Sequence, residues 1–451
     1  MKTPFFSIVI PTYNRSDLFP HAVRSILNQT FEDFEIVISD NCSTDDTSEV
    51  ARQFKDPRFK YVRTPQHFTI ADSWEFSRSH AVGKLIFMLS DDDALLPRTL
   101  ERFAHESRYH DADFMFCTPA YYRDLSYPGP DRNSVDCPSF SGASRVVQAE
   151  EFVRPLFLFR QKFDMHPSAF AFAKTIADLV VTRTGRFFWT NGVEYSAWPI
   201  AASFSKKLVH IDAPLIIVGR TAKSWGSNIK LCNPGKERIQ QFINDVDHER
   251  RHAPLNNFTM CNLMAEGTLA AKSLFPKEFE AYEFDEVRYL RSSLAELRTR
   301  QTLGVDVSEE IRDAIDYATK YPGLAEEFKA SSARGVKSTL RRRIRSKIGD
   351  LGARAVRQRI AAYQLAKKLE QGGACSGFTA FGKDFGFSDI LGCVEFLGRY
   401  LLTSPKKAFY AATSLAPVKL VPSAKSPLLF PGSSGICVAH RRGAEDAEKN
   451  D

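Results

Sequence analysis

Short apolar runs alternate with amphipathic stretches over the first hundred residues. Four runs rich in β-branched and aromatic residues predict strands: 5–10, 34–39, 59–62 and 85–89. Apolar residues at helical spacing predict the helices between them: 16–29, 45–54 and 71–81. Nearly continuous apolar strands in β-α-β order are typical of a parallel sheet covered by helices on both faces. The expected fold class is therefore α/β, with a mostly parallel sheet and flanking helices.

The pattern changes twice further along the chain. Between about residues 114 and 220 it consists of short, aromatic-rich runs separated by Pro, Gly and Ser, which predicts the remaining sheet edge and enclosing loops. The stretch 231–403 has mainly helical periodicity, and the Pro-rich tail 404–451 is expected to be extended or disordered. We therefore expect a first unit of two halves, 1–110 and 111–230, followed by a mainly helical C-terminal region and a tail.

Composition narrows the class of protein. The 451 residues are 43% apolar, enough for two or three domains with buried cores. The longest run without a charged residue is 15 residues, 426–440, shorter than a membrane-spanning helix needs. Eight cysteines without a CxxC pair favour reduced thiols, and no signal peptide is evident at the N-terminus. We expect a cytoplasmic protein without a transmembrane helix.

Positive charge is concentrated in one segment. Residues 334–368 contain twelve Lys and Arg and one acidic residue, Asp350, although the net charge of the whole chain is only +7. Apolar residues at helical spacing within this segment predict an amphipathic basic helix. Such a helix suits an anionic membrane surface, which would place the protein on the inner membrane face, but it also suits docking on the rest of the protein. RNA binding is less favoured because few aromatic residues interleave with the charges, so no nucleic-acid partner is expected.

Polar clusters follow three of the predicted strands, at 12–15, 40–46 and 91–93. Ligands of open α/β sheets bind beyond the carboxyl ends of the strands, so one crevice should collect all three clusters. Three consecutive carboxylates, Asp91 to Asp93, repel one another, and a divalent cation such as Mg²⁺ or Mn²⁺ would offset them. Capping of the following helix is the alternative, but it accounts for one carboxylate rather than three. Asp40 is not needed as a helix cap and could accept the N–H of a nucleotide base.

The order and spacing of these segments closely resemble the family 2 glycosyltransferases with the GT-A fold. The resemblance covers about residues 5–105 and is carried by three stretches: Ser7 to Arg15, Ser25 to Asp45, and Gly83 to Pro97. It implies that residues 1–110 are the nucleotide-sugar-binding half of a GT-A domain and 111–230 the acceptor-binding half. One difference is Ser90, which occupies the first position of the family's Asp-x-Asp-Asp element.

The resemblance also assigns site residues. Nucleotide-sugar contacts are carried over to the first loop and the two acidic elements: Pro11, Thr12, Tyr13, Asn14, Arg15, Asp40, Asp91 and Asp92. Asp92 and Asp93 are the expected ligands of Mn²⁺ or Mg²⁺, with Asp92 the first choice. Glu194 is the expected general base, because it is the single carboxylate of the segment 185–199 where the family places its base. Its alternative role is a charge at a helix N-terminus, and Asp164 and His166 also resemble the acceptor side.

The expected function is transfer of a sugar, with inversion, from a nucleoside diphosphate sugar to an acceptor hydroxyl. A UDP-sugar donor, a saccharide or lipid-linked acceptor and a divalent metal are expected, in polysaccharide or glycoconjugate synthesis. A sugar-nucleotide nucleotidyltransferase is an alternative, although the loop 11–15 lacks the glycines such an enzyme would need. The other alternative is a catalytically degenerate domain that binds a membrane or partner through 334–368.

Overall fold

The computed structural model describes residues 2–129, 131–224, 252–257, 259–302, 305–330 and 378–403. The basic segment 334–368 and the tail 404–451 lie outside these residues, so the expectations for them stay predictions. The domain boundaries predicted at residues 110, 230 and 403 also stay predictions. Every described residue belongs to one compact unit.

The larger sheet has eight strands in the described residues. Five precede residue 120: β1 (Phe6–Thr12), β2 (Phe34–Asp40), β3 (Phe59–Arg63), β4 (Leu85–Met88) and β6 (Phe114–Cys117). The others are β9 (Ser144–Val147), β10 (Phe170–Ala173) and β11 (Leu208–Ile211). Their order is β3-β2-β1-β4-β10-β6-β11-β9, and β10 is antiparallel to both its neighbours. The predicted α/β class with a mostly parallel sheet is confirmed.

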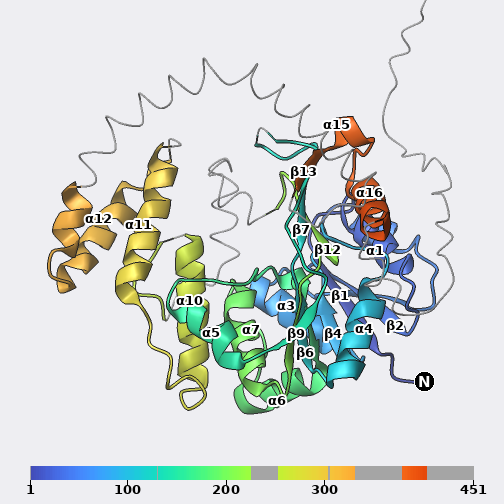
Figure 1. The fold of residues 1–451 in the computed structure, drawn as a ribbon, viewed down its shortest axis with the longest axis horizontal. Helices are drawn as coiled ribbons and strands as arrows, with labels where there is room; N and C mark the ends of the chain where they lie inside the picture. Colours follow the sequence, from blue (N-terminus) through green and yellow to red (C-terminus); the bar gives the residue numbers. More distant parts are fainter. Residues whose placement is uncertain are drawn as a thin grey trace, which may run out of the picture. The chain divides into compact units, whose positions relative to one another are not determined.

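Helices lie on both faces of this sheet. The early ones are α1 (Phe19–Leu27), α2 (Thr47–Ala51), α3 (Ile70–Ser79) and α4 (Thr99–His110). The later ones are α5 (Ala149–Phe157), α6 (Lys174–Thr184) and α7 (Val193–Phe204). Figure 1 shows α3 and α7 on one side of the sheet and α1 and α4 on the other. The first two predicted helices begin and end outside α1 and α2; the observed helices start later because the loops before them bond to each other rather than continuing the helix.

Strand register brings the polar clusters together. β1 is parallel to β2, with Thr12 beside Asp40, and parallel to β4, with Val9 beside Met88. The loops after β1, β2 and β4 therefore leave the sheet at the same edge, as the apolar pattern predicted.

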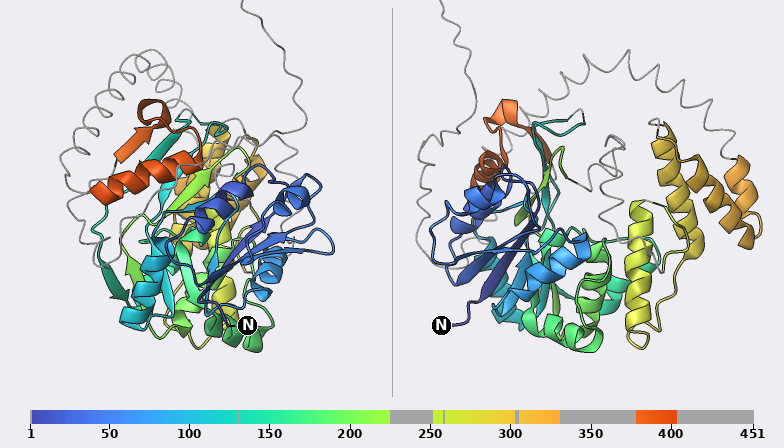
Figure 2. Two further views of the ribbon diagram at one scale, coloured as in Figure 1. Left: turned by 90° about the vertical axis from the view of Figure 1, so that its right-hand side faces the viewer. Right: turned by 180° about the vertical axis from the view of Figure 1, so that it is seen from behind.

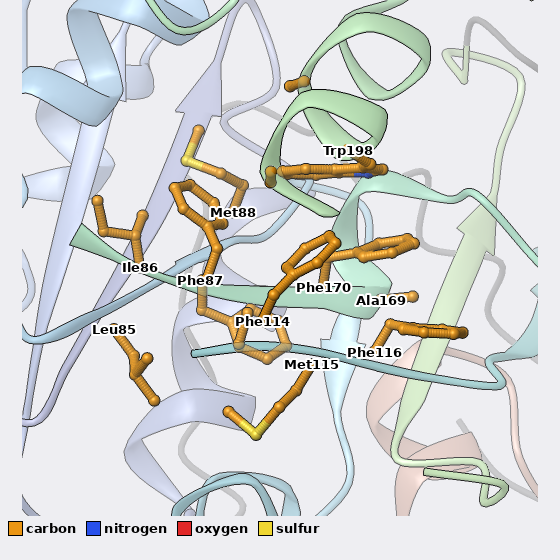
Figure 3. Packing of buried hydrophobic residues seen from close by; sticks show 14 of the residues in the cluster. Leu85, Ile86, Phe87, Met88, Phe114, Met115, Phe116, Ala169, Phe170 and Trp198 are labelled. Carbon is orange, nitrogen blue, oxygen red and sulfur yellow. The ribbon is translucent and has the colours of Figure 1, made fainter. Parts of the chain in front are cut away.

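Aromatic residues fill the core between this sheet and α7. Phe170 of β10 stacks on Trp198 of α7 with ring centroids 5.0 Å apart, and Phe114 stacks on Phe170 at 5.6 Å (Figure 3). Trp198, Phe87 and Phe170 are fully buried. Because α7 is fixed on the sheet by these rings, the residues at its N-terminus have a defined position above the strand ends.

A second sheet contains a strand that the sequence did not predict. It comprises β5 (Ala94–Leu95), β7 (Ala120–Arg123), β8 (Ser134–Cys137), β12 (Ile216–Arg220) and β13 (Phe378–Phe381), in the order β13-β8-β7-β12-β5. β13 is followed by α15 (Gly382–Phe385) and α16 (Ile390–Thr403), and α16 contacts β5, β12 and α1 (Figure 2). Cys393 and Leu397 of α16 are fully buried in this small core. The region 231–403, expected to be mainly helical, therefore also supplies a strand.

The other described part of that region is helical, as predicted. α10 (Met260–Leu274) packs on α7, and α11 (Glu286–Thr302) and α12 (Ser308–Tyr317) follow. The contact between α10 and α7 is close at Gly267, where a Cβ would lie 2.5 Å from Tyr195 Cβ. The N-terminus of α10 is capped by Thr259, whose side chain accepts the Asn262 N–H. This packing brings the first turn of α10 beside the N-terminus of α7.

Candidate active site

A cavity of about 470 Å³ opens where β1 and β4 end. Its walls come from the loops after these strands, the end of β12, the segment before β10, and the first turns of α3, α7 and α10. The acidic, basic and histidine residues that line it are Arg15, Asp91, Asp92, Asp164, His166, Glu194 and Arg220. The predicted nucleotide, metal and base residues that reach one cavity are thus Pro11, Thr12, Tyr13, Arg15, Asp91, Asp92 and Glu194.

Asp91 and Asp92 form the acidic part of the cavity. Arg15 Nη1 lies 2.9 Å from Asp91 Oδ1 and 3.2 Å from Asp92 Oδ2. Thr12 Oγ1 donates to Asp91 Oδ2 at 2.8 Å, and Ser224 Oγ donates to Asp92 Oδ2 at 2.5 Å. The two carboxylates are therefore fixed by residues from the ends of β1 and β12.

Burial and charge act in opposite directions on this cluster. Burial raises the pKa of Asp91 to about 6, against the lowering effect of Arg15. Burial alone would lower the pKa of Arg15, but the carboxylates of Asp91 and Asp92 outweigh it and raise that pKa. One guanidinium thus faces two carboxylates, and the cluster keeps an excess of acidic groups.

Asp93, the second predicted metal ligand, is buried and does not line the cavity. Its Oδ1 accepts the Gly219 N–H at 2.8 Å, and its Oδ2 accepts the Ser168 hydroxyl. His166 Nδ1 lies 3.5 Å from the same Oδ2. Burial raises the pKa of Asp93 well above its usual value. The carboxylate of Asp93 joins β12 and the segment before β10 to the acidic turn, and its metal-ligand role stays a prediction.

Asn14 connects two loops rather than lining the cavity. Its φ of 52° places it in the left-handed region, which Asn tolerates better than most residues. Its Oδ1 accepts the N–H of Thr44 at 2.7 Å, and its own N–H donates to Ser43 Oγ at 2.9 Å. The neighbouring Tyr13 does line the cavity, and its ring lies 4.4 Å from that of His67.

Asp40 lies at the end of β2, as predicted, but its carboxylate is fully buried and does not line the cavity. Its Oδ2 accepts from Arg63 Nη1 at 2.8 Å and from the Tyr61 hydroxyl at 2.5 Å, while its Oδ1 accepts the Ser43 N–H at 2.8 Å. Burial and the bond to Asp40 raise the pKa of Tyr61 to about 12. The expected contact with a base must therefore compete with three donors.

Glu194 is the second residue of α7 and lines the cavity together with Asp164. The turn before α7 is tied to α3, because Asn191 Oδ1 accepts the Ala71 N–H at 3.2 Å. Asp164 accepts the Tyr121 hydroxyl through Oδ2 and the His166 N–H through Oδ1, the latter at 2.9 Å. Glu194, the predicted base, and Asp164 therefore both line the cavity that holds Asp91 and Asp92.

Several lining residues were not found from the sequence. Gly219, Arg220 and Ser224 come from the end of β12 and the loop after it, and Met260 and Leu263 come from α10. A strand-end signal exists for the first group, because the apolar run 215–218 ends directly before them. The α10 residues have no such signal, since they reach the cavity only through the packing of α10 on α7.

In the described ranges, no set of three or more His, Cys, Asp or Glu side chains is arranged to hold a metal ion. Within the same ranges, no helix combines the length and the apolar character that a membrane crossing requires.

Residues 7–178 match the family model Glycosyl transferase family 2. A curated relative is the GalNAc(5)-diNAcBac-PP-undecaprenol beta-1,3-glucosyltransferase of Campylobacter jejuni, 36% identical over 114 residues, which are 24% of this chain and 37% of that protein. The chain thus spans less than half the length of this relative. Within residues 7–178 the chain is thus similar to glycosyltransferase family 2. In the larger sheet, β10 lies antiparallel between β4 and β6.

Two solved structures are similar to the chain. One is TarS residues 1–349 of S. aureus in complex with UDP-GlcNAc, at 14% identity and a TM-score of 0.42, covering 72% of this chain and 83% of that one. The other is the mannosyltransferase PcManGT of Pyrobaculum calidifontis with GDP-Man and Mn²⁺, at 15% identity and a TM-score of 0.37, covering 74% and 88%.

Proposed function

We propose that this protein is a glycosyltransferase that moves a sugar from a nucleoside diphosphate sugar to an acceptor hydroxyl, with inversion and with a divalent metal ion. The observation that carries the proposal is the meeting of Asp91 and Asp92 with Glu194 in one cavity of a family 2 domain. Acidic oxygens suit a hard cation, and a carboxylate across the same cavity suits proton removal from the acceptor.

We assign the metal to Asp92, with Asp91 beside it. Both carboxylates reach the cavity, and Arg15 offsets only one of their two charges, so the site fits a divalent cation. Mg²⁺ and Mn²⁺ are commonly held by one or two carboxylates together with substrate phosphates and water, and a protein cage of three ligands is not required. When bound, such a cation would offset the charge that develops on the diphosphate leaving group.

The residues around the cation would bind and orient the donor. Thr12 and Arg15 hold the Asp91 carboxylate through both its oxygens, which fixes its direction. Tyr13, beside His67, offers an aromatic face on the nucleotide side of the cavity. Asp40 would act indirectly: it accepts the Ser43 N–H and so holds the loop that carries Asn41, a residue that lines the cavity. UDP-sugars remain the first donors to test.

Glu194 is the proposed general base. It would take the proton of the acceptor hydroxyl as that oxygen attacks the sugar carbon, while the nucleoside diphosphate leaves from the opposite side. It lies at the start of α7, which contacts α3 and α10, and these two helices supply Trp74 and Leu263 as apolar parts of the same cavity. The Campylobacter relative is named for a lipid-diphosphate-linked acceptor, so a lipid-linked saccharide is a reasonable first acceptor.

A donor screen tests this function. Hydrolysis of UDP-, GDP- and dTDP-sugars is measured with Mn²⁺ and with EDTA, for the parent, Asp92→Asn and Asp178→Asn. Asp178 is the matched control, because it pairs with Lys174 on α6 and does not line the cavity. We expect metal-dependent turnover of at least one donor by the parent and by the control, and its loss in Asp92→Asn. A parent that shows neither metal-dependent turnover nor metal-dependent binding of any donor would refute the proposal.

We also propose that the basic segment 334–368 attaches the enzyme to an anionic membrane surface. Each Lys or Arg near such a surface contributes about 1 kcal/mol, so a few of the twelve would suffice. Sedimentation with anionic vesicles at low salt, release at high salt, and no binding to neutral vesicles are expected. Failure to sediment with anionic vesicles at low salt would contradict this attachment.

A further inference from the structure

Arg220 is a half-buried cation in the cavity wall that the chemistry proposed above does not use. Its guanidinium carbon lies 4.1 Å from the ring centroid of Tyr121. Arg15, the other guanidinium of the cavity, is already paired with two carboxylates. Among the residues that the structure describes, no carboxylate forms an ion pair with Arg220.

The surroundings of Arg220 fix its position. β12 is parallel to β7, and Val218 lies beside Tyr121 while Arg220 lies beside Arg123. The preceding residue, Gly219, is held by its bond to Asp93. The Tyr121 ring is fixed as well, because its hydroxyl donates to Asp164. Arg220 is therefore presented by a strand end and an aromatic face, both of which are anchored independently of any ligand.

A stacked guanidinium keeps the donors along its edge available. Stacking on an aromatic ring uses the flat face of the group, whereas its N–H bonds lie in the plane and suit two oxygens of one phosphate. A partly desolvated cation beside a ring is also more strongly attracted to an anion than it would be in water. Asp91 and Asp92 line the same cavity, so the proposed metal position and the Arg220 guanidinium share one cavity.

We propose that Arg220 binds a phosphate group of a substrate in this cavity. The inference rests on the proposed transfer from a nucleoside diphosphate sugar. Two sources of phosphate fit: the diphosphate of the donor, and a phosphate carried by the acceptor. Arg220 follows Gly219, which contacts the acidic turn. It also lies over the ring of Tyr121, which contacts Asp164 on the predicted acceptor side. A phosphate from either source would therefore enter the cavity that Arg220 lines.

Calorimetric titration of the full chain tests this proposal. The variants are Arg220→Gln and Arg220→Lys. The matched control is Arg123→Gln, which removes the same charge from the neighbouring strand. Arg123 pairs with Asp136 and does not line the cavity. The probes are UDP, uridine and pyrophosphate, each with Mn²⁺, and inorganic phosphate added to enzyme saturated with UDP and Mn²⁺.

If the donor supplies the phosphate, Arg220→Gln should weaken UDP and pyrophosphate binding by roughly tenfold or more and leave uridine binding unchanged. If the acceptor supplies it, UDP binding should stay the same and phosphate binding to the UDP-saturated enzyme should fall by a similar factor. Arg220→Lys should lie between parent and Arg220→Gln, because a lysine keeps the charge but not the two-oxygen geometry.

The proposal is overturned if Arg220→Gln binds every phosphate probe with the same affinity as the parent and the Arg123→Gln control. It is also overturned if the parent binds none of these probes. This failure differs from failure of the proposed function. A parent that neither binds nor hydrolyses any sugar nucleotide but binds pyrophosphate through Arg220 would refute the transferase and keep the phosphate site. A parent that turns over a donor with Arg220→Gln unaffected in every titration would do the reverse.

Discussion

Gly219 lies directly against the backbone of Asp92: a Cβ built on Gly219 would be 1.8 Å from the Asp92 carbonyl oxygen. Its N–H also donates to Asp93 Oδ1 at 2.8 Å, across 126 residues of sequence. A side chain cannot occupy that space without moving the turn or the strand. The position of the acidic cluster therefore depends on a glycine of β12, more than a hundred residues further along the chain.

Gly219→Ala should displace Asp92 and reduce metal-dependent donor turnover. A shift of about 1 Å in a positioned group costs roughly 10²-fold in rate, so a loss of that order is expected. Turnover and Mn²⁺ affinity are measured beside Gly398→Ala, where a new Cβ meets Pro97 at an ordinary 3.7 Å. Equal activity of the two variants would show that the turn adapts to the added methyl group.

Glu194→Gln should slow transfer by roughly 10²-fold or more while leaving donor binding nearly unchanged, because it removes proton acceptance and preserves shape. Transfer rate and UDP affinity are measured with Asp164→Asn for comparison. Full activity in Glu194→Gln together with loss in Asp164→Asn would reassign the base to Asp164.

Arg15→Gln should destabilise the metal-free protein, because Asp91 and Asp92 would lose the cation they share. Removing one partner of a buried ion pair costs about 3–5 kcal/mol of unfolding free energy. Mn²⁺ should restore more stability to this variant than to the parent, since the ion supplies the missing charge. Denaturant unfolding with Mn²⁺ and with EDTA measures both effects.

The control for that experiment is Arg58→Gln, whose partner Asp56 lies in a more exposed pair and should contribute about 1 kcal/mol or less. Equal losses in the two variants, or a loss in Arg15→Gln that Mn²⁺ does not reduce, would contradict the shared-cation interpretation.

His210 should make the fold sensitive to acid. Burial lowers the pKa of His210 to about 4. Asp212 and Glu151 oppose this shift with smaller effects, whereas Arg145 lowers the pKa further. The unfolded chain has a histidine pKa of about 6.5 and binds the proton first. The contribution of neutral His210 to stability is therefore complete above about pH 6.5 and is lost as the pH falls from there towards 4.

His210→Phe removes this titration and keeps a ring for Phe116, which lies 4.7 Å from the imidazole. The unfolding free energy of this variant should fall less steeply than that of the parent between pH 6.5 and 4. Parallel curves for the two proteins would show that His210 does not contribute to the pH dependence.

The strands and their polar ends were predictable because the signal is local. Runs such as Ile8 to Ile10 and Ile36 to Ile38 are fully buried strands, and parallel pairing necessarily brings Thr12 and Asp40 to one edge. The direction of each side chain was not predictable in the same way. Asp91 and Asp92 face the cavity and Asp93 does not, because Ser168 and Gly219, distant in sequence, bind the third carboxylate.

Asp40 illustrates the same limit. Its position followed from the pattern, but its environment depends on Arg63, which lies opposite it at the end of β3. An unoccupied acceptor and an acceptor already bound by a guanidinium have the same local sequence. Only the register of β2 with β3 distinguishes them.

The pairing of β13 with β8 has a consequence for synthesis of the chain. Thr379 bonds to Asp136 across 243 residues, so the second sheet cannot close until the ribosome has added them. At 5–20 residues per second this takes roughly 10–50 s, during which the edge of β8 and the apolar residues that α16 later covers are open to other chains. A polypeptide released before residue 378 would keep that edge, and we expect it to need a chaperone or to aggregate even with every residue of its cavity present.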